Sequence, residues 1–296
     1  MSKLTFDLVL LYYDKPEILD NWFIRLLNHS DYLKFKNISN IIIADSGSPL
    51  DRVEETLKII RKYKDQCSII YSRADTDELR KTVPEDIDAR PACHAYNMAA
   101  LDISTADVIF TSVIGQIFTP EYFSRILVEH IKNDKAVVLS KRFDLICSTY
   151  HSDLFDSNFS EIEKFSLQPS GGWPDMSVRR KWLQEVGGWD ENYITISPVD
   201  MDLGSRLTGK LDNGMPSEFL FTFKGKFDNL NLDFIQPFTR SLCYSLTCNQ
   251  YPGHRPTGDS RRQKGYDLGI KYYLENWNKI IRNENRIPIN FKIYEI

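Results

Sequence analysis

The sequence predicts an α/β fold with a mainly parallel, doubly wound sheet. Short strand-like runs alternate with amphipathic helical patterns through the first half, which is the order expected of βαβ units. The first run, FDLVLLYY (6–13), is apolar on both faces, as in a strand covered by helices on both sides. With 296 residues, 42% of them hydrophobic, the chain is long enough to bury a sizeable core.

The predicted elements follow in a regular order. Apolar residues at helical spacing (Ile18, Trp22, Leu26) predict a helix over 15–30, and LDRVEETLKII gives a second one over 49–63. The helix predicted at 120–133 opens with a proline at its first position. Further helices are predicted at 89–104 and 179–187, and strands at 6–13, 38–48, 67–73, 106–115 and 135–146.

The second half loses this alternation. Residues 150–175 and 208–260 are rich in turn-forming and polar residues. Residues 261–286 predict a terminal helix, whose apolar positions would serve either core packing or a homodimer seam: Tyr266, Ile270, Tyr273, Leu274, Trp277 and Ile281. We expect one α/β domain over 1–207, with halves at about 1–146 and 147–207, and a C-terminal extension over 208–296 that packs on the same domain.

Net charge, hydropathy and cysteine content argue against a nucleic-acid-binding, a membrane-spanning or a disulfide-rich secreted protein. The net charge of −4 argues against a nucleic-acid partner, whose binding proteins are usually basic. No run approaches the apolar length of a transmembrane segment, and the N-terminal apolar run is broken by Asp14. Five scattered cysteines favour a reducing compartment over a disulfide framework. We expect a cytoplasmic protein, with contact at a membrane surface as the alternative.

Polar residues follow four of the predicted strands. They are Tyr13–Asp14, Asp45–Ser48, the segment from Arg90 to Asn97, and the segment from Val113 to Gln116. Ligands of doubly wound sheets bind at the carboxyl ends of the strands, so these residues predict a binding cleft. A carboxylate such as Asp45 would accept a hydrogen bond from a nucleobase N–H, although it could equally cap its own turn. The absence of Gly-x-Gly-x-x-Gly after the first strand argues against a dinucleotide-binding dehydrogenase or a Rossmann methyltransferase.

Several blocks together resemble a known family. DLVLLYYDKPEIL, NIIIADSGSPLD, YNMAA, TPEYF and MSVRRKWLQEVGGWDENY…VDMDLGSRL, in this order over residues 5–207, are similar to the family 2 glycosyltransferases of the GT-A fold. The resemblance implies a nucleotide-sugar donor, most simply a UDP-sugar, and transfer to a saccharide or lipid-linked acceptor, with inversion at the anomeric carbon. It also implies a donor-binding N-terminal half and an acceptor-binding second half.

The resemblance assigns roles to individual residues. Tyr13 would stack on or border the base, Asp45 would hold it, and Arg90 would reach the nucleotide, while Asn97 matches the family's helix asparagine. Ser46 and Gln116, at the ends of the second and fourth strands, are further candidates for the nucleotide-sugar site. Trp173 and Asp175 would border the acceptor sugar, and Asp202 would be either structural or acceptor-binding. Asp200 falls on the catalytic base of the family's Glu-Asp motif, in which Val199 replaces the glutamate.

Two interpretations of Asp200 stay open. Ser197 as N-cap and Pro198 at the first helical position would make Asp200 part of a helix cap. Asp202 and Arg206 would then be an ordinary ion pair one turn apart. Alternatively, the positive end of the helix dipole keeps Asp200 ionised and ready to accept a proton. Capping alone does not explain why the helix follows GGWDENY, so we favour the base.

One departure from the family concerns the metal. The position of its Asp-x-Asp motif is occupied here by Val113-Ile114-Gly115, none of which offers the oxygen ligands that Mn²⁺ or Mg²⁺ prefer. Three alternatives follow. Basic residues could replace the metal against the diphosphate (His254, Arg255, Arg261, Arg262 and Lys264). A metal could instead bind Asp200, Asp202 or His254. The protein could also bind a nucleotide or a carbohydrate without catalysis.

Overall fold

The computed structural model describes most of the chain. Described are residues 4–87, 89, 91–146, 152–162, 164, 166–169, 175–194, 199–209, 230–235, 240–244, 260–276 and 289–296. At 141, 142, 144–146, 166–169, 240–244 and 262 only the backbone is described.

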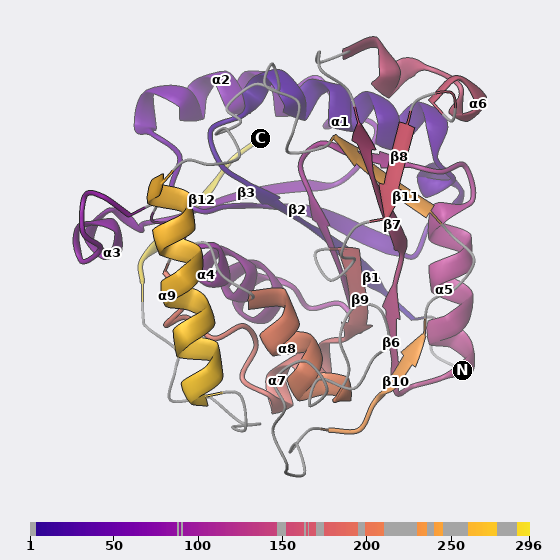
Figure 1. Cartoon of the computed structure of the whole chain (residues 1–296). Helices are drawn as coiled ribbons and strands as arrows, with labels where there is room; N and C mark the ends of the chain where they lie inside the picture. Colours follow the sequence, from indigo (N-terminus) through magenta and orange to yellow (C-terminus); the bar gives the residue numbers. More distant parts are fainter. Residues whose placement is uncertain are drawn as a thin grey trace.

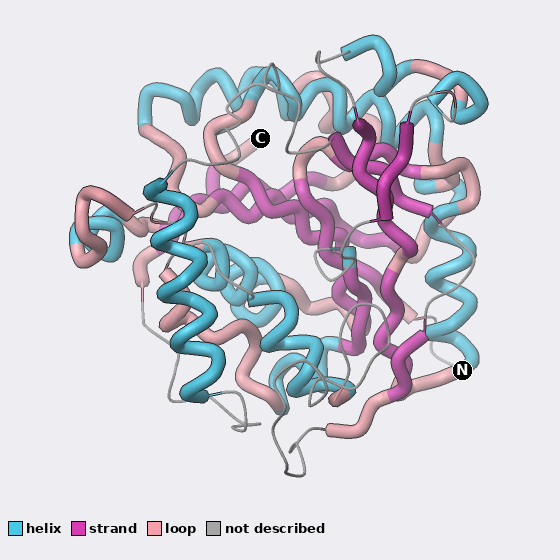
Figure 2. Tube along the Cα trace, in the orientation of Figure 1, coloured by secondary structure: helices cyan, strands magenta, loops and turns pink. Residues whose placement is uncertain are grey.

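An eight-stranded sheet crosses the centre of the molecule, drawn as magenta tubes in Figure 2. Its order is β10 (Asp233–Ile235), β6 (Ala136–Leu139), β9 (Met176–Arg179), β4 (Val108–Val113), β1 (Phe6–Tyr12), β2 (Ile38–Asp45), β3 (Ile69–Ala74) and β12 (Phe291–Tyr294). The strands run parallel except β9 and β12, which pair antiparallel with their neighbours. The predicted α/β class with a mainly parallel sheet is confirmed.

Helices cover both faces of this sheet, as Figure 1 shows. On one face lie α1 (Pro16–His29), α2 (Leu50–Ile60) and α5 (Tyr122–Lys132), over a core that includes Trp22 and Phe118. On the other lie α4 (Ala92–Asn97), its π-helical continuation Met98–Ile103, α7 (Arg180–Glu185), α8 (Val199–Thr208) and α9 (Ser260–Asn276). The remaining short helical elements are Tyr32–Lys34, α3 (Asp77–Lys81), Ser152–Asp156 and α6 (Phe159–Ile162).

A second, four-stranded sheet corrects one sequence prediction. It contains β5 (Gln116–Phe118), β11 (Arg240–Tyr244), β7 (Lys141–Ile146) and β8 (Ser166–Pro169). The single strand predicted at 135–146 is therefore two strands in different sheets, separated at Ser140. AVVL is wholly apolar and fits between two covered faces, whereas KRFDLI carries three charged residues and pairs outside the main sheet.

The C-terminal part of the chain contributes strands to both sheets. Strand β10 extends the main sheet beside β6, β12 pairs with β3 at the opposite edge, and β11 lies inside the small sheet. The division of the chain at residue 207 stays a prediction.

Helix α9 begins one residue before the predicted start, and residues 277–288, with Trp277 and Ile281, lie outside the described chain. Tyr273 is fully buried against the core below α8, whereas Tyr266 is 43% exposed. Core packing therefore accounts for part of the aromatic face predicted on this helix. In the ranges described above, no helix has the length and apolar character needed to cross a bilayer.

Candidate functional site

The loops that follow β1 and β2 lie side by side because the two strands are adjacent and parallel. The backbone N–H of Asp14 donates to Oγ of Ser48 at 2.7 Å, and the N–H of Ser46 donates to the carbonyl of Tyr12 at 3.0 Å. Asp14 adopts a positive φ of 42° at the turn into α1. The sequence-predicted residues Tyr13, Asp45 and Ser46 are thus brought together at the carboxyl end of the sheet.

Asp45 is fully buried and holds the turn from within. Its Oδ1 accepts hydrogen bonds from the N–H groups of Gly47 and Ser48 and from Oγ of Ser48, and its Oδ2 accepts one from Tyr71 at 2.5 Å. Burial raises the pKa of Asp45, and the hydrogen bonds from Tyr71 and Ser48 oppose that rise. Both oxygens are engaged, so a nucleobase N–H would have to displace one of these donors.

Gly47 is required where it stands. It adopts a φ of 97°, and a Cβ atom at this position would lie 2.2 Å from Oγ1 of Thr76. Oγ1 of Thr76 in turn donates to the carbonyl of Ser46 at 2.9 Å. The Ser-Gly turn is therefore pressed against the segment that follows β3.

Tyr13 is 40% exposed and is covered on one side by Arg80 of α3. The guanidinium carbon lies 4.6 Å from the centre of the tyrosine ring, a cation–π distance. Arg80 also donates to the carbonyls of Ser46 at 2.8 Å and Ala89 at 2.9 Å. Sequence reasoning missed Arg80, which lies in the polar run TDELRK without an apolar pattern to mark it.

The end of β4 offers nothing to a divalent cation. Ile114 and Gly115 form a turn, with Gly115 at a φ of 90°, and β5 begins at Gln116. The buried amide of Gln116 accepts from Ser112 at 2.5 Å and donates to Tyr122 at 3.0 Å, so its polar atoms are used within the fold. Among the described residues, no group of three or more His, Cys, Asp or Glu side chains is placed to hold a metal. The residues at this strand end do not fit Mn²⁺ or Mg²⁺.

On the other side, Asn97 anchors the Gly-Gly-Trp-Asp-Glu loop. Its amide donates to the carbonyl of Trp189 at 2.7 Å and to Oε1 of Glu191 at 2.9 Å, and its oxygen accepts from the N–H of Trp189 at 2.9 Å. A Cβ atom at Gly188, whose φ is 72°, would lie 2.1 Å from that oxygen. The loop therefore needs glycine at this position.

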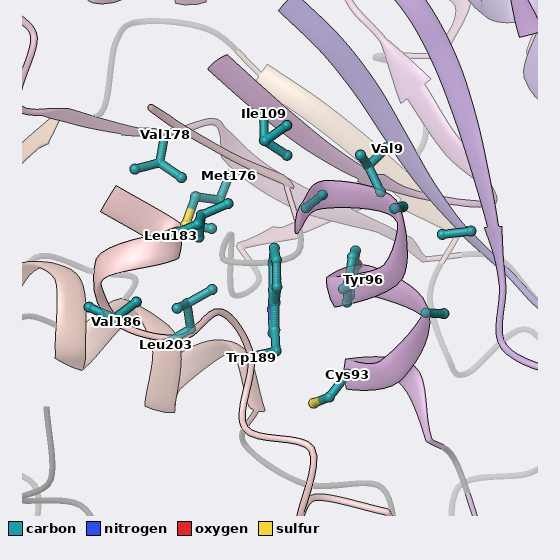
Figure 3. Packing of buried hydrophobic residues seen from close by; sticks show 14 of the residues in the cluster. Val9, Cys93, Tyr96, Ile109, Met176, Val178, Leu183, Val186, Trp189 and Leu203 are labelled. Carbon is teal, nitrogen blue, oxygen red and sulfur yellow. The ribbon is translucent and has the colours of Figure 1, made fainter. Parts of the chain in front are cut away.

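Figure 3 shows Trp189 standing beside Tyr96 of α4, and the two rings stack with centroids 4.6 Å apart. The predicted nucleotide-site residue Asn97 thus lies under the loop, fully buried. The contacts that the structure describes for the Asn97 side chain are hydrogen bonds to Trp189 and Glu191 of the Gly-Gly-Trp-Asp-Glu loop.

Asp202 and Arg206 form a buried ion pair in α8. The Nη2–Oδ2 distance is 2.9 Å, and the side chains are 1% and 0% exposed. Arg206 also donates to the carbonyls of Val186 at 2.7 Å and Gly188 at 2.8 Å. Through these contacts Arg206 joins α8 to the Gly-Gly turn. The ion pair between Asp202 and Arg206 is the one that the sequence offered as an alternative. Its predicted contact with an acceptor stays a prediction.

Asp200 lies in the first turn of α8 and is half-buried. Its surroundings are acidic, as the thiol of Cys93 on α4 shows. Burial raises the pKa of Cys93 well above its ordinary value, and four carboxylates raise it further: Asp190, Glu191, Asp200 and Asp202. Asp190 accepts a hydrogen bond from Tyr272 of α9 at 2.9 Å, so the C-terminal helix reaches the same region.

The remaining predicted residues fall in different places. Asp175 is fully buried just before β9. Arg261 and Lys264 of α9 contact the segment before α4, through the carbonyl of Ile87 at 3.4 Å and the carboxylate of Asp86 at 2.5 Å. Arg90, Trp173, His254 and Arg255 lie outside the described residues, as does the side chain of Arg262.

Comparison with known proteins rests on structure. No family model and no curated protein sequence matches the chain. A crystal structure of GalNAc-T7 with UDP, GalNAc and Mn²⁺ superimposes on 93% of this chain with a TM-score of 0.54 and 9% sequence identity. The chain has the GT-A fold.

This chain spans about half of the GalNAc-T7 chain, 49% of its length. TarS from S. aureus also matches, over 82% of this chain and 35% of its own, with 10% identity. Its TM-score of 0.43 is too low to argue from. At these identities the GT-A fold is what the similarity establishes.

Proposed function

We propose that the protein is a glycosyltransferase that moves a sugar from a nucleotide-sugar donor, most simply a UDP-sugar, to a hydroxyl of a saccharide or lipid-linked acceptor. The observation that carries the proposal is that a GT-A fold holds both a polar cluster at its strand ends and a half-buried carboxylate at the start of a helix. The cluster contains exposed Tyr13 beside Asp45 and Ser46. The carboxylate is Asp200.

In the proposed reaction, the acceptor oxygen attacks the anomeric carbon from the face opposite the leaving group. A carbon–oxygen bond forms to the acceptor, the bond from the anomeric carbon to the phosphate oxygen breaks, and the configuration inverts. Asp200 takes the proton of the hydroxyl, and the nucleoside diphosphate leaves with the bonding electrons. Because Val113, Ile114 and Gly115 do not fit a metal, cationic side chains would stabilise the leaving diphosphate.

Asp200→Asn tests the base. General-base assistance contributes roughly 10² to 10⁴ in rate, so we expect kcat to fall by about that factor while UDP binding is unchanged. Asp51→Asn is a matched control because Asp51 is likewise the second residue of its helix, α2. A turnover for Asp200→Asn equal to that of the control would show that the carboxylate only caps its helix.

NMR of the product tests the proposed inversion, and a product of retained anomeric configuration would contradict it.

UDP binding measured by thermal shift with and without EDTA tests the metal-independent arrangement, since a ligand of the native state raises the melting temperature. We expect the shift to survive EDTA.

A second candidate is a nucleotide- or carbohydrate-binding protein without catalysis. One feature favours it: the position of the family's metal-binding motif holds no ligand side chain, only Val113, Ile114 and Gly115. This candidate predicts UDP binding with neither sugar transfer nor donor hydrolysis.

A further inference from the structure

A cavity of about 430 Å³ lies between the segment after β3 and the start of α9. It is lined by Arg80, Lys81, Val83, Pro84, Glu85, Ile87, Ala89 and Arg261. Pockets that bind small molecules in proteins have volumes of about 300–1,000 Å³, so this one is large enough for a sugar phosphate or part of a nucleotide. In Figure 1, α3 and α9 lie near each other on one side of the molecule.

The charges that line this cavity are mostly positive. Arg80, Lys81 and Arg261 bring three cationic groups, against the single carboxylate of Glu85. The chain as a whole carries a net charge of −4, so the cavity is a local reversal of the overall sign. A concave site lined by one sign of charge concentrates ligands of the opposite sign.

Arg80 is held in place while part of its guanidinium stays available. Thr76, Ala89 and Ser46 accept one hydrogen bond each from its Nε, Nη1 and Nη2 atoms. An arginine side chain has five N–H donors, so two remain beyond its bonds to residues that the structure describes. A guanidinium fixed in this way needs no reordering to meet a phosphate oxygen.

Lys81 can be redirected at small cost. Its ion-pair partner Glu78 is 86% exposed, and exposed pairs of this kind contribute little to stability. Arg261 reaches the cavity from α9 and donates to the carbonyl of Ile87 over a long 3.4 Å. The apolar side chains of Val83 and Ile87 would meet the carbon skeleton of a ligand whose phosphate faces the cations.

We propose that this cavity binds a phosphate group of one of the protein's substrates, through Arg80, Lys81 and Arg261. The identification of the ligand as a substrate rests on the proposed glycosyl transfer. The phosphate would belong either to the nucleotide donor or to a phosphorylated acceptor. Of the predicted basic residues whose side chains the structure describes, Arg261 lines this cavity, and Arg80 and Lys81 join it from α3.

The test measures the affinity of the full chain for inorganic pyrophosphate by calorimetry at low salt. The variant is the double substitution Lys81→Gln with Arg261→Gln, which leaves Arg80 and its backbone contacts in place. Losing two charge-assisted contacts should raise the Kd by about tenfold or more. Arg125→Gln with Lys132→Gln on α5 is the matched control, because it removes the same charge from exposed ion pairs elsewhere. We expect the control to keep the Kd of the unmodified protein.

Competition identifies the source of the phosphate. Pyrophosphate that is displaced by UDP indicates the diphosphate of the donor, whereas pyrophosphate that binds beside saturating UDP indicates a phosphorylated acceptor. The inference is wrong if the chain does not bind pyrophosphate, or if the cavity and control variants bind it equally. Either result would leave the Asp200 experiment intact, since sugar transfer is measured separately.

Discussion

The turn after β2 and the loop before α8 both rely on glycine at positive φ, but the carboxylates next to them differ in burial and in hydrogen-bond partners. Each contains a glycine at positive φ that lies against a polar side chain, Gly47 against Thr76 and Gly188 against Asn97. On the β2 side, Asp45 is buried among neutral donors. On the α8 side, Asp202 is buried against Arg206, while Asp200, two residues earlier, is half-buried.

The difference separates carboxylates that hold the fold from one that stays accessible. A carboxylate whose oxygens are committed to the fold contributes rigidity, because removing its partners leaves a costly buried charge. Asp45 is of this kind, and Asp202 is buried with its Oδ2 paired to Arg206. Asp200 is half-buried at the start of α8, so it keeps the access to solvent that the proposed general base requires.

Arg206→Met should have the largest effect on stability. It leaves Asp202 buried without its cation, which typically costs about 3–5 kcal/mol, and the free energy of unfolding in urea measures the loss. Arg125→Met is the matched control, because Arg125 pairs with Glu121 at the same spacing on the surface of α5. There we expect a change of about 0.5 kcal/mol or less. Equal losses for the two variants would contradict the contrast between buried and exposed pairs.

Tyr71→Phe should have an intermediate effect. It removes the hydroxyl that donates to buried Asp45, and an unsatisfied buried acceptor costs about 1–3 kcal/mol. Tyr63→Phe makes a fair comparison, since the hydroxyl of Tyr63 donates to Asp20, whose side chain is 32% exposed. Water can replace that bond, so urea unfolding should show a smaller loss. A larger loss for Tyr63→Phe would mean that Asp45 does not depend on Tyr71.

The smallest effect concerns pH. Because the folded-state pKa of Asp45 lies above its ordinary value of 3.8, the native protein binds this proton more readily than the unfolded chain. The stability of the unmodified protein relative to Asp45→Asn should therefore increase as the pH falls from neutral through the folded-state pKa towards 3.8, and decrease as it rises. Urea unfolding of both proteins at several pH values measures the difference. Parallel stability curves would contradict the raised pKa.

The sequence predicted the sheet better than the contacts of the site. Strand β1 is apolar apart from Asp7, so its burial followed from composition, and the turn at Asp45–Ser48 followed from its Asp-Ser-Gly chemistry. The four-residue strands β9 and β12 were missed because they are too short to show a period.

Side-chain networks depend on segments that are distant in the sequence. Asn97 donates a hydrogen bond to Trp189, which lies 92 positions later, and no local sequence pattern predicts such a contact. For the same reason the involvement of Tyr71 with Asp45 was not foreseen.

Strand β12 has a consequence for how the protein is made. Residues Tyr71–Ala74 of β3 pair on their outer side with Phe291–Tyr294, which follow about 220 residues later. At a synthesis rate of roughly 5–20 residues per second, the outer edge of β3 would stay without its partner strand for about 10–40 s. During this interval the exposed edge of β3 can pair with a strand of another nascent chain. Slower translation, or deletion of β12, should therefore favour aggregation over correct folding.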